Sequence, residues 1–299
     1  MDNYGFYTGK SFDAYEFFGC HTDENGAVFR VFAPAAVRIS VIGEFNGWQD
    51  TPMNKIGDGN FWAVYIEGVK PGQMYKYKIY KPDGSCMDHC DPYGYGMELR
   101  PASASIVRNL YGYEFQDDAW MKKRSNGVAS ALNIYEIHAG SWKKPQNGWY
   151  RYDELAMQLV PYLKEYGYNY IELLPIGEHP CDESWGYQCS GFYSPTSRYG
   201  TLDDYKKMID ILHHNDIGVI MDFVPVHFAL DAYALAKFDG TALYEYPHKD
   251  VGNSEWGSCN FMHSRGEVRS FLQSCANYWL KEYHVDGLRM DAISNMIYW

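Results

Sequence analysis

The fold is decided between residues 170 and 222, where two apolar runs flank one amphipathic segment. The first run reads Tyr170-Ile-Glu-Leu-Leu174 and the second reads Ile217-Gly-Val-Ile-Met-Asp222. Between them, Thr201 and Asp204 match a capping box, and apolar side chains follow at helical spacing. A strand, a helix and a second strand in this order predict two parallel strands joined by a crossover helix.

The same alternation continues on both sides of this unit. Strand-like runs cover Leu132–His138 before it and Val285–Met290 after it. We expect Asp153 to cap the helix that follows the first run, and Ser264 to open the helix that precedes the last run. The chain from Ala131 onward therefore predicts a parallel α/β architecture.

The length of this second part limits what it can be. It contains about four strands and three helices, whereas a complete eight-stranded barrel needs about 250 residues. We expect residues 113–299 to form either a small open α/β sheet or the first half of a TIM (β/α)8 barrel that ends after strand 4. Tyr298 and Trp299 carry no terminating signal, which favours the half barrel.

Before residue 107 the pattern is different, because short alternating runs are separated by turn residues. In the clearest run, Tyr75, Tyr77 and Ile79 share one face, while Lys76 and Lys78 share the other. Short strands at this spacing are typical of a β-sandwich of about 90 residues. The expected fold class is therefore multidomain β plus α/β, with a β-sandwich over residues 1–112. The expected strands are Val28–Phe32, Arg38–Ile42, Phe61–Ile66 and Tyr75–Tyr80.

Composition excludes several classes of partner. The 299 residues carry a formal net charge of −12, which argues against nucleic acid and against an anionic membrane surface. No apolar stretch is long enough for a transmembrane helix, and no secretory signal opens the chain. The odd number of cysteines, 7, is typical of free thiols in a cytoplasmic protein. Aromatic residues make up 17%, which suits a sugar ligand or a packed core equally.

A few polar residues allow more than one interpretation. Cys86, His89 and Cys90 could bind a metal, but their spacing is not a standard zinc pattern, so we expect no metal site. Trp48 could stack on a glucan or anchor a turn. We interpret His213 and the neighbouring histidine as partners of the helix dipole.

Charged residues gather at the ends of the last two predicted strands. Asp222 closes one strand, and His227 follows it by five positions. Arg289 and Asp291 lie two positions apart at the end of the next strand, so their side chains should face the same space. The carboxyl ends of parallel strands form the active-site face of such folds, and the positive charge of Arg289 would keep Asp291 ionised. From spacing alone, a structural arginine–aspartate pair is an equally good interpretation.

These stretches resemble the α-amylase superfamily, glycoside hydrolase family 13, and within it the 1,4-α-glucan (glycogen) branching enzymes. The N-terminal runs are similar to the carbohydrate-binding module that precedes the barrel in that family. The likeness covers almost the whole chain. The motifs that carry it are Asp222-Phe-Val-Pro-Val-His227, Gly287-Leu-Arg-Met-Asp291, Ile134-Tyr-Glu-Ile-His-Ala-Gly-Ser-Trp142, Glu172-Leu-Leu-Pro-Ile-Gly-Glu-His-Pro180, Ser184-Trp-Gly-Tyr-Gln188, Tyr193-Ser-Pro-Thr-Ser-Arg-Tyr-Gly-Thr201, Phe29-Arg-Val-Phe-Ala-Pro34 and Gly43-Glu-Phe-Asn-Gly-Trp48.

The resemblance implies a role for each matching residue. Asp291 stands at the position of the catalytic nucleophile, and Arg289 at that of the arginine that orients it. His227 matches the histidine that hydrogen-bonds the sugar in the cleavage subsite, and Tyr187 matches the tyrosine that stacks on the same sugar. Asp222 matches a largely structural aspartate.

The implied activity is that of a branching transglycosylase. The enzyme cuts an α-1,4-glucan such as glycogen or amylose, holds the piece on Asp291, and passes it to a 6-hydroxyl of another glucan. No metal or organic cofactor is implied. A retaining mechanism needs two carboxylates about 5 Å apart, and the acid/base glutamate of the family follows strand 5. The resemblance therefore implies a fragment that is inactive by itself.

Two other functions stay open. One is an isoamylase-type debranching hydrolase, against which the Ser184–Gln188 loop and the Tyr193–Thr201 loop argue. The other is a non-catalytic glycan-binding protein that uses only its β-sandwich.

Overall fold

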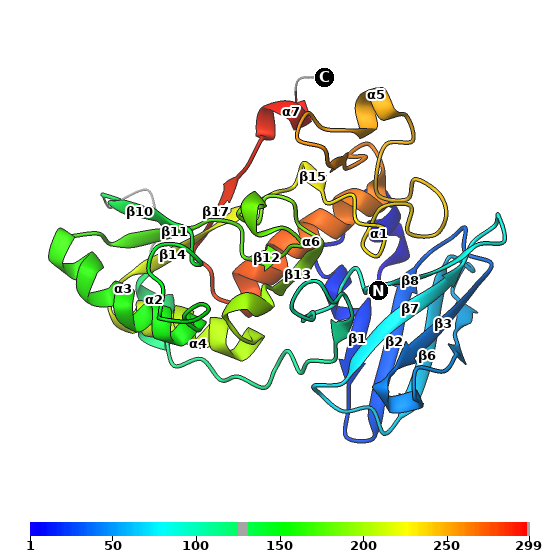
Figure 1. Cartoon of the computed structure of the whole chain (residues 1–299), viewed down its shortest axis with the longest axis horizontal. Helices are drawn as coiled ribbons and strands as arrows, with labels where there is room; N and C mark the ends of the chain where they lie inside the picture. Colours follow the sequence, from blue (N-terminus) through cyan, green and yellow to red (C-terminus); the bar gives the residue numbers. More distant parts are fainter. Residues whose placement is uncertain (125–130, 298–299) are drawn as a thin grey trace.

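The computed structural model describes residues 1–124 and 131–297. The last part of the connector that follows the predicted sandwich, and the terminal Tyr298 and Trp299, lie outside these ranges. An antiparallel N-terminal part and a parallel C-terminal part lie side by side (Figure 1). None of the helices described has the length and apolar character needed to cross a membrane.

The N-terminal part consists of two antiparallel sheets, as the alternating runs predicted. One sheet has the order β1-β2-β6-β5 and the other has the order β4-β3-β7-β8, with β9 beside β7. On β7, Tyr75, Tyr77 and Ile79 are buried, while the two lysines between them are partly exposed. The boundary at residue 112 stays a prediction. The strands are β1 (Gly19–Thr22), β2 (Gly26–Phe32), β3 (Arg38–Gly43), β4 (Thr51–Pro52), β5 (Asn54–Ile56), β6 (Phe61–Glu67), β7 (Met74–Tyr80), β8 (Cys86–His89) and β9 (Ser105–Ile106).

The C-terminal part has one parallel sheet whose spatial order, β10-β11-β14-β17, follows the chain. One long helix lies in each connection, which confirms the predicted first half of a (β/α)8 barrel. The strands are β10 (Ile134–Ile137), β11 (Tyr170–Leu173), β14 (Gly218–Phe223) and β17 (Gly287–Met290), and the helices are α3 (Tyr152–Tyr166), α4 (Leu202–His214) and α6 (Gly266–Glu282).

The first of these helices begins differently from the prediction. Asp153 is not its cap but lies inside the first turn of α3, where it accepts a hydrogen bond from Lys207 at 2.8 Å. The helix starts after Arg151, whose backbone N–H donates to the Glu154 carboxylate at 3.0 Å. The residue after the predicted cap, Glu154, completes the capping box, so the helix begins one residue before Asp153.

The other two helix starts gave one confirmation and one correction. Thr201 and Asp204 form the predicted capping box at the start of α4. In contrast, Ser264 is not the cap of α6, which begins at Gly266. A Cβ at this glycine would lie 1.8 Å from the carbonyl oxygen of Tyr7. The first residue of α6 therefore packs tightly against the N-terminal helix α1 (Asn3–Thr8). This contact joins distant parts of the chain, so the residues around Ser264 could not indicate it.

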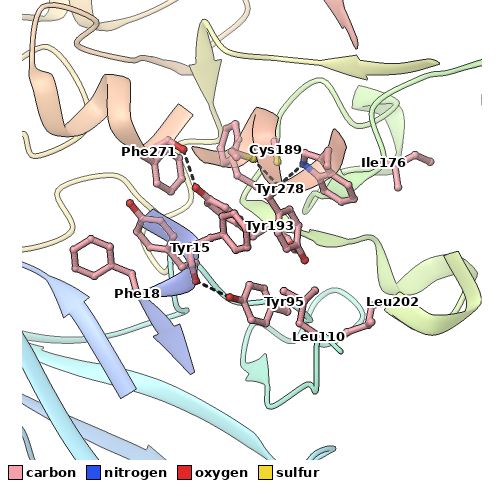
Figure 2. Packing of buried hydrophobic residues seen from close by; sticks show 14 of the residues in the cluster. Tyr15, Phe18, Tyr95, Leu110, Ile176, Cys189, Tyr193, Leu202, Phe271 and Tyr278 are labelled. Carbon is pink, nitrogen blue, oxygen red and sulfur yellow. Dashed lines mark hydrogen bonds between the residues drawn. The ribbon is translucent and has the colours of Figure 1, made fainter. Parts of the chain in front are cut away.

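An aromatic cluster joins the two parts of the molecule (Figure 2). The Tyr95 hydroxyl donates to the Tyr15 carbonyl at 2.7 Å, and its ring stacks on Tyr278 with centroids 5.5 Å apart. The Tyr193 hydroxyl donates to the Phe271 carbonyl on α6 at 2.8 Å. Buried tyrosines can pack as apolar groups here because each of these hydroxyls finds a carbonyl acceptor.

A buried histidine ties the connector to the parallel sheet. Nδ1 of His213 lies 2.7 Å from Asp117, and its Nε2 lies 2.9 Å from Asp286. The ring is fully buried and lies in the last turn of α4, so the contacts with two carboxylates come in addition to the predicted place near the helix end. The indole N–H of Trp120, in α2 (Asp118–Lys123), also donates to Asp286 at 2.9 Å. These contacts hold the chain that enters the half barrel against the loop before β17.

We expect His213→Ala to lower the free energy of unfolding by about 1–3 kcal/mol, because each of two buried carboxylates loses one hydrogen-bond partner. Asp117 keeps its contact with His284, and Asp286 keeps the indole N–H of Trp120. The matched control is His214→Ala, since the ring of this neighbouring histidine is half exposed. That variant should change stability by about 0.5 kcal/mol or less. Urea denaturation followed by circular dichroism measures both. Equal losses in the two variants would contradict the bridging role.

Candidate active site

The parallel pairing of β14 with β17 builds the centre of the site. In the register of this pair, Asp222 lies opposite Arg289. Asp291 follows β17 directly, and its backbone N–H donates to the Phe223 carbonyl at 3.0 Å, which extends the pairing by one step. The three charged side chains therefore meet at the carboxyl ends of two neighbouring strands, which is where parallel α/β folds carry their active sites.

Arg289 bridges the two carboxylates. One of its terminal nitrogens donates to both oxygens of Asp222, at 3.0 and 3.1 Å, and to Asp291 at 2.5 Å. The Asp222 side chain is buried, whereas one fifth of the Asp291 side chain stays exposed. One carboxylate is thus fixed inside the sheet, and the other is oriented but remains open to a ligand.

Tyr187 holds the inner carboxylate from the other side. Its hydroxyl donates to Asp222 at 2.6 Å. Burial raises the pKa of Asp222, and the hydrogen bonds from Tyr187 and Arg289 act against that increase. Burial and the hydrogen bond to Asp222 raise the pKa of Tyr187, so its hydroxyl keeps its proton and acts as a donor. Asp222 is therefore an anchor for two other site residues.

His227 comes from a separate small antiparallel sheet. It lies in β15 (His227–Phe228), which pairs with β16 (Cys259–Asn260). The side chain is almost completely buried, and within the part of the chain that the structure describes, its Nδ1 has no hydrogen-bond partner. Burial lowers the pKa of His227, although the negative charge of Asp291 acts to raise it. A neutral imidazole therefore faces the same space as the open carboxylate.

These residues enclose a pocket of about 380 Å³. Among the described residues that line it, Asp291 is the only one with a carboxylate. Asp222 is not part of the lining, in agreement with its role as an anchor. The lining residues are Ser184, Tyr187, Gln188, His227, Trp256 and Asp291.

The sequence did not single out three members of the pocket. Ser184 and Gln188 stand in a motif of the family resemblance in which only Tyr187 was predicted to contact the ligand. Trp256 carried no signal, because it lies in a loop far along the chain. Its ring centroid is 5.4 Å from that of His227, and its carbonyl accepts a hydrogen bond from Gln188 at 2.9 Å. This bond fastens two walls of the pocket to each other.

The possible metal ligands near β8 are not gathered into a site. Cys86 is exposed, Cys90 is buried, and Nδ1 of His89 lies 2.9 Å from the Ala234 carbonyl. Across residues 1–124 and 131–297, no three histidine, cysteine or acidic side chains are grouped so that they could hold a metal ion.

Comparisons with known protein families match both parts of the chain. Residues 17–94 match carbohydrate-binding module 48, described as the isoamylase N-terminal domain. Residues 156–250 match the α-amylase catalytic domain. The two matches fall on the antiparallel part and on the parallel part, respectively.

The similarity to longer, curated proteins extends over the whole chain. It is 46% identical to the 1,4-alpha-glucan branching enzyme GlgB of Fusobacterium nucleatum, over 100% of this chain and 50% of that protein. It is 47% identical to the enzyme of the same name from Nitrosospira multiformis, over 99% of this chain and 41% of that protein. The chain thus spans about half the length of the curated relatives it matches.

Solved structures share the fold. A putative α-amylase from Salmonella typhimurium has a TM-score of 0.77 at 26% identity, over 94% of this chain and 44% of that one. Apo pullulanase from Paenibacillus barengoltzii has a TM-score of 0.76 at 20% identity, over 93% of this chain and 48% of that one.

The environment of His227 predicts its titration. Burial should hold its pKa below the usual value of 6.5. In Asp291→Asn the pKa should fall further, because a negative charge that favours the imidazolium is removed. In the unfolded chain this histidine has its usual pKa, so the unfolded state takes up a proton first as the pH falls. Folding stability should therefore decrease as the pH falls through 6.5. Titration of the ring by NMR measures both values. A midpoint at or above 6.5, or no response to Asp291→Asn, would contradict this description.

Proposed function

Since this chain is a member of the α-amylase family that corresponds to the N-terminal half of the 1,4-α-glucan branching enzymes, we propose that its pocket binds α-1,4-glucan and that Asp291 is the nucleophile. The observation that carries this proposal is the orientation of Asp291. It is the carboxylate in the lining of the pocket, and Arg289 holds it at 2.5 Å while one face stays open.

The proposed reaction has two displacements. In the first, an Asp291 oxygen bonds to the anomeric carbon of a glucose unit, and the bond from that carbon to the 4-oxygen of the next unit breaks. In the second, the 6-hydroxyl of an acceptor glucan attacks the same carbon and releases Asp291. The net result is one α-1,4 bond exchanged for one α-1,6 bond.

The neighbouring side chains supply orientation and binding. Arg289 aims the nucleophile, because it is anchored on the buried Asp222 and donates to Asp291. Tyr187 offers an aromatic face to the apolar side of the sugar, while its hydroxyl is held by Asp222. His227, neutral and facing the pocket, serves as a hydrogen-bonding group for a sugar hydroxyl.

The leaving oxygen needs a proton from a second carboxyl group, about 5 Å from the first. In the second displacement the incoming hydroxyl gives its proton to that same group, which restores it. Asp222 is unsuited to this role, because both of its oxygens are occupied by Arg289 and it lies outside the lining. We propose that the acid/base glutamate belongs to the half of the branching enzymes that this chain does not match.

The N-terminal part supports the same function. We propose that residues 1–112 form a glucan-binding β-sandwich and that residues 113–299 form the incomplete catalytic barrel, a division supported by the module match over residues 17–94. The seven cysteines are all free, which supports a cytoplasmic location for the proposed glycogen synthesis.

Two alternative functions can be distinguished by the reaction products and by the reactivity of Asp291. A debranching hydrolase would need the same nucleophile, and a longer protein containing this chain would then raise reducing ends as branches disappear. A non-catalytic glycan-binding protein would leave Asp291 without reactivity toward an activated sugar. The relatives named as branching enzymes favour transfer over both.

Reactivity of Asp291 can be tested without a general acid. Fluoride is a leaving group that needs little protonation, so α-maltosyl fluoride should form a covalent maltosyl adduct on Asp291. Without the second carboxylate the adduct should accumulate. Intact-mass spectrometry followed by peptide mapping would locate it.

The control is Asp291→Asn, which keeps the shape of the side chain and removes its charge. It should give no adduct. Absence of labelling in the unsubstituted chain, or equal labelling in Asp291→Asn, would contradict the proposed nucleophile.

A further inference from the structure

A second hollow of about 270 Å³ lies at the carboxyl end of β10, and the proposed mechanism does not use it. Its walls combine aromatic rings with charged groups. Its principal lining residues are His138, Trp149, Asp182, Trp185, Arg198 and Tyr199.

The second hollow is separated from the Asp291 pocket by a single loop. Ser184 and Tyr187 line the Asp291 pocket, whereas Glu183 and Trp185 line the second hollow. Consecutive residues of one turn thus face two different spaces.

The loop between the hollows is held rigidly. Asp182 accepts hydrogen bonds from Arg198 at 2.6 and 2.9 Å and forms a further ion pair with Arg100. The guanidinium of Arg198 is buried and also donates to the buried Glu178 at 2.8 Å. Two arginines from different segments therefore fix the start of the loop, so the wall between the hollows is preorganised.

Trp185 occupies an unfavourable position in this rigid loop. Its φ is +53°, in the left-handed region, where a bulky residue is strained by about 1–3 kcal/mol. Its side chain is 56% exposed, so burial in a core does not offset that strain. The carbonyl of Pro175 would lie 2.3 Å from a Cβ at Gly186, which prevents a simple shift of the turn. An exposed and strained tryptophan at the rim of a hollow points to a ligand that uses its ring.

The hollow suits a neutral polyhydroxylated ligand. Trp149 packs edge-on against Tyr199 with centroids 6.2 Å apart, and the ring of His138 lies 6.3 Å from that of Trp185. These rings offer faces to the apolar side of a sugar. The charged residues of the lining, Lys144, Asp182, Glu183 and Arg198, contribute two positive and two negative charges, so the lining has no net charge that would select an ion.

We propose that Trp185 is the stacking platform of a second glucose-binding subsite, which holds the same α-glucan chain several units away from the sugar bound over Asp291. This inference rests on the proposed function, because it assigns to the hollow an outer part of the same ligand. In this arrangement, the loop that carries Trp185 and Tyr187 determines how long a glucan chain the protein holds.

The test compares a short and a long glucan on the 299-residue chain, with maltose and maltoheptaose titrated by isothermal calorimetry. Trp185→Gly should weaken maltoheptaose binding about tenfold, the loss of roughly one aromatic stacking contact, and leave maltose binding unchanged. The same variant should keep or raise the melting temperature, because glycine tolerates the positive φ. Trp185→Phe, which keeps a ring, should retain most of the affinity for maltoheptaose.

The control is Tyr4→Ala, which removes a ring that is 72% exposed on α1. It should change neither affinity. Binding by the β-sandwich adds the same background to every variant, since residues 17–94 are unaltered in the Trp185 variants.

The outcomes separate this inference from the proposed function. Equal losses for maltose and maltoheptaose, or no loss for either sugar in Trp185→Gly, would overturn the second subsite. A lower melting temperature together with equal losses would assign Trp185 a purely structural role. Tyr187→Ala tests the Asp291 pocket itself: if it weakens neither sugar, or if no sugar binds the unsubstituted chain, the proposed function fails and the second subsite fails with it.

Discussion

The site depends on one guanidinium placed between two carboxylates. Arg289 lies opposite Asp222 because β14 and β17 are parallel neighbours in register, and it reaches Asp291 because that residue follows β17 directly. The buried carboxylate of Asp222 is compensated by Arg289, which is itself partly exposed, and by the hydroxyl of Tyr187. The same contact that stabilises the sheet thus orients the residue proposed to react.

Buried ion pairs also hold the loops around the pocket. Arg198 links Glu178 to Asp182 under the loop that presents Tyr187 and Trp185. His213 performs a comparable task at the opposite end of the sheet, between two carboxylates. In each case a buried side chain that contacts two carboxylates fixes a segment without regular secondary structure. The composition did not decide whether the aromatic side chains form a core or bind a sugar. Most of them pack inside, and the exposed Trp185 and Trp256 lie at the two pockets.

Local patterns in the sequence predicted the elements better than their ends or their distant contacts. The alternation on β7 and the capping box on α4 act over a few residues, and both were confirmed. The partners of His213 are 96 and 73 residues away, so no local pattern could show that its ring is buried between them. Trp256 lies in the pocket in a loop that precedes β16, and a hydrogen bond from Gln188 holds that loop there. The motifs at the strand ends could be located from sequence, whereas the walls of the pocket depend on loops whose course is set by tertiary contacts.

The central claim is that the sugar to be transferred lies over Asp291, between Tyr187 and His227. A crystal structure of Asp291→Asn with maltoheptaose tests it most directly, because this variant keeps the shape of the pocket and cannot react. The account predicts one glucose unit against the Tyr187 ring, with its anomeric carbon facing residue 291. Maltoheptaose bound only on the β-sandwich, or with no anomeric carbon near residue 291, would contradict the account.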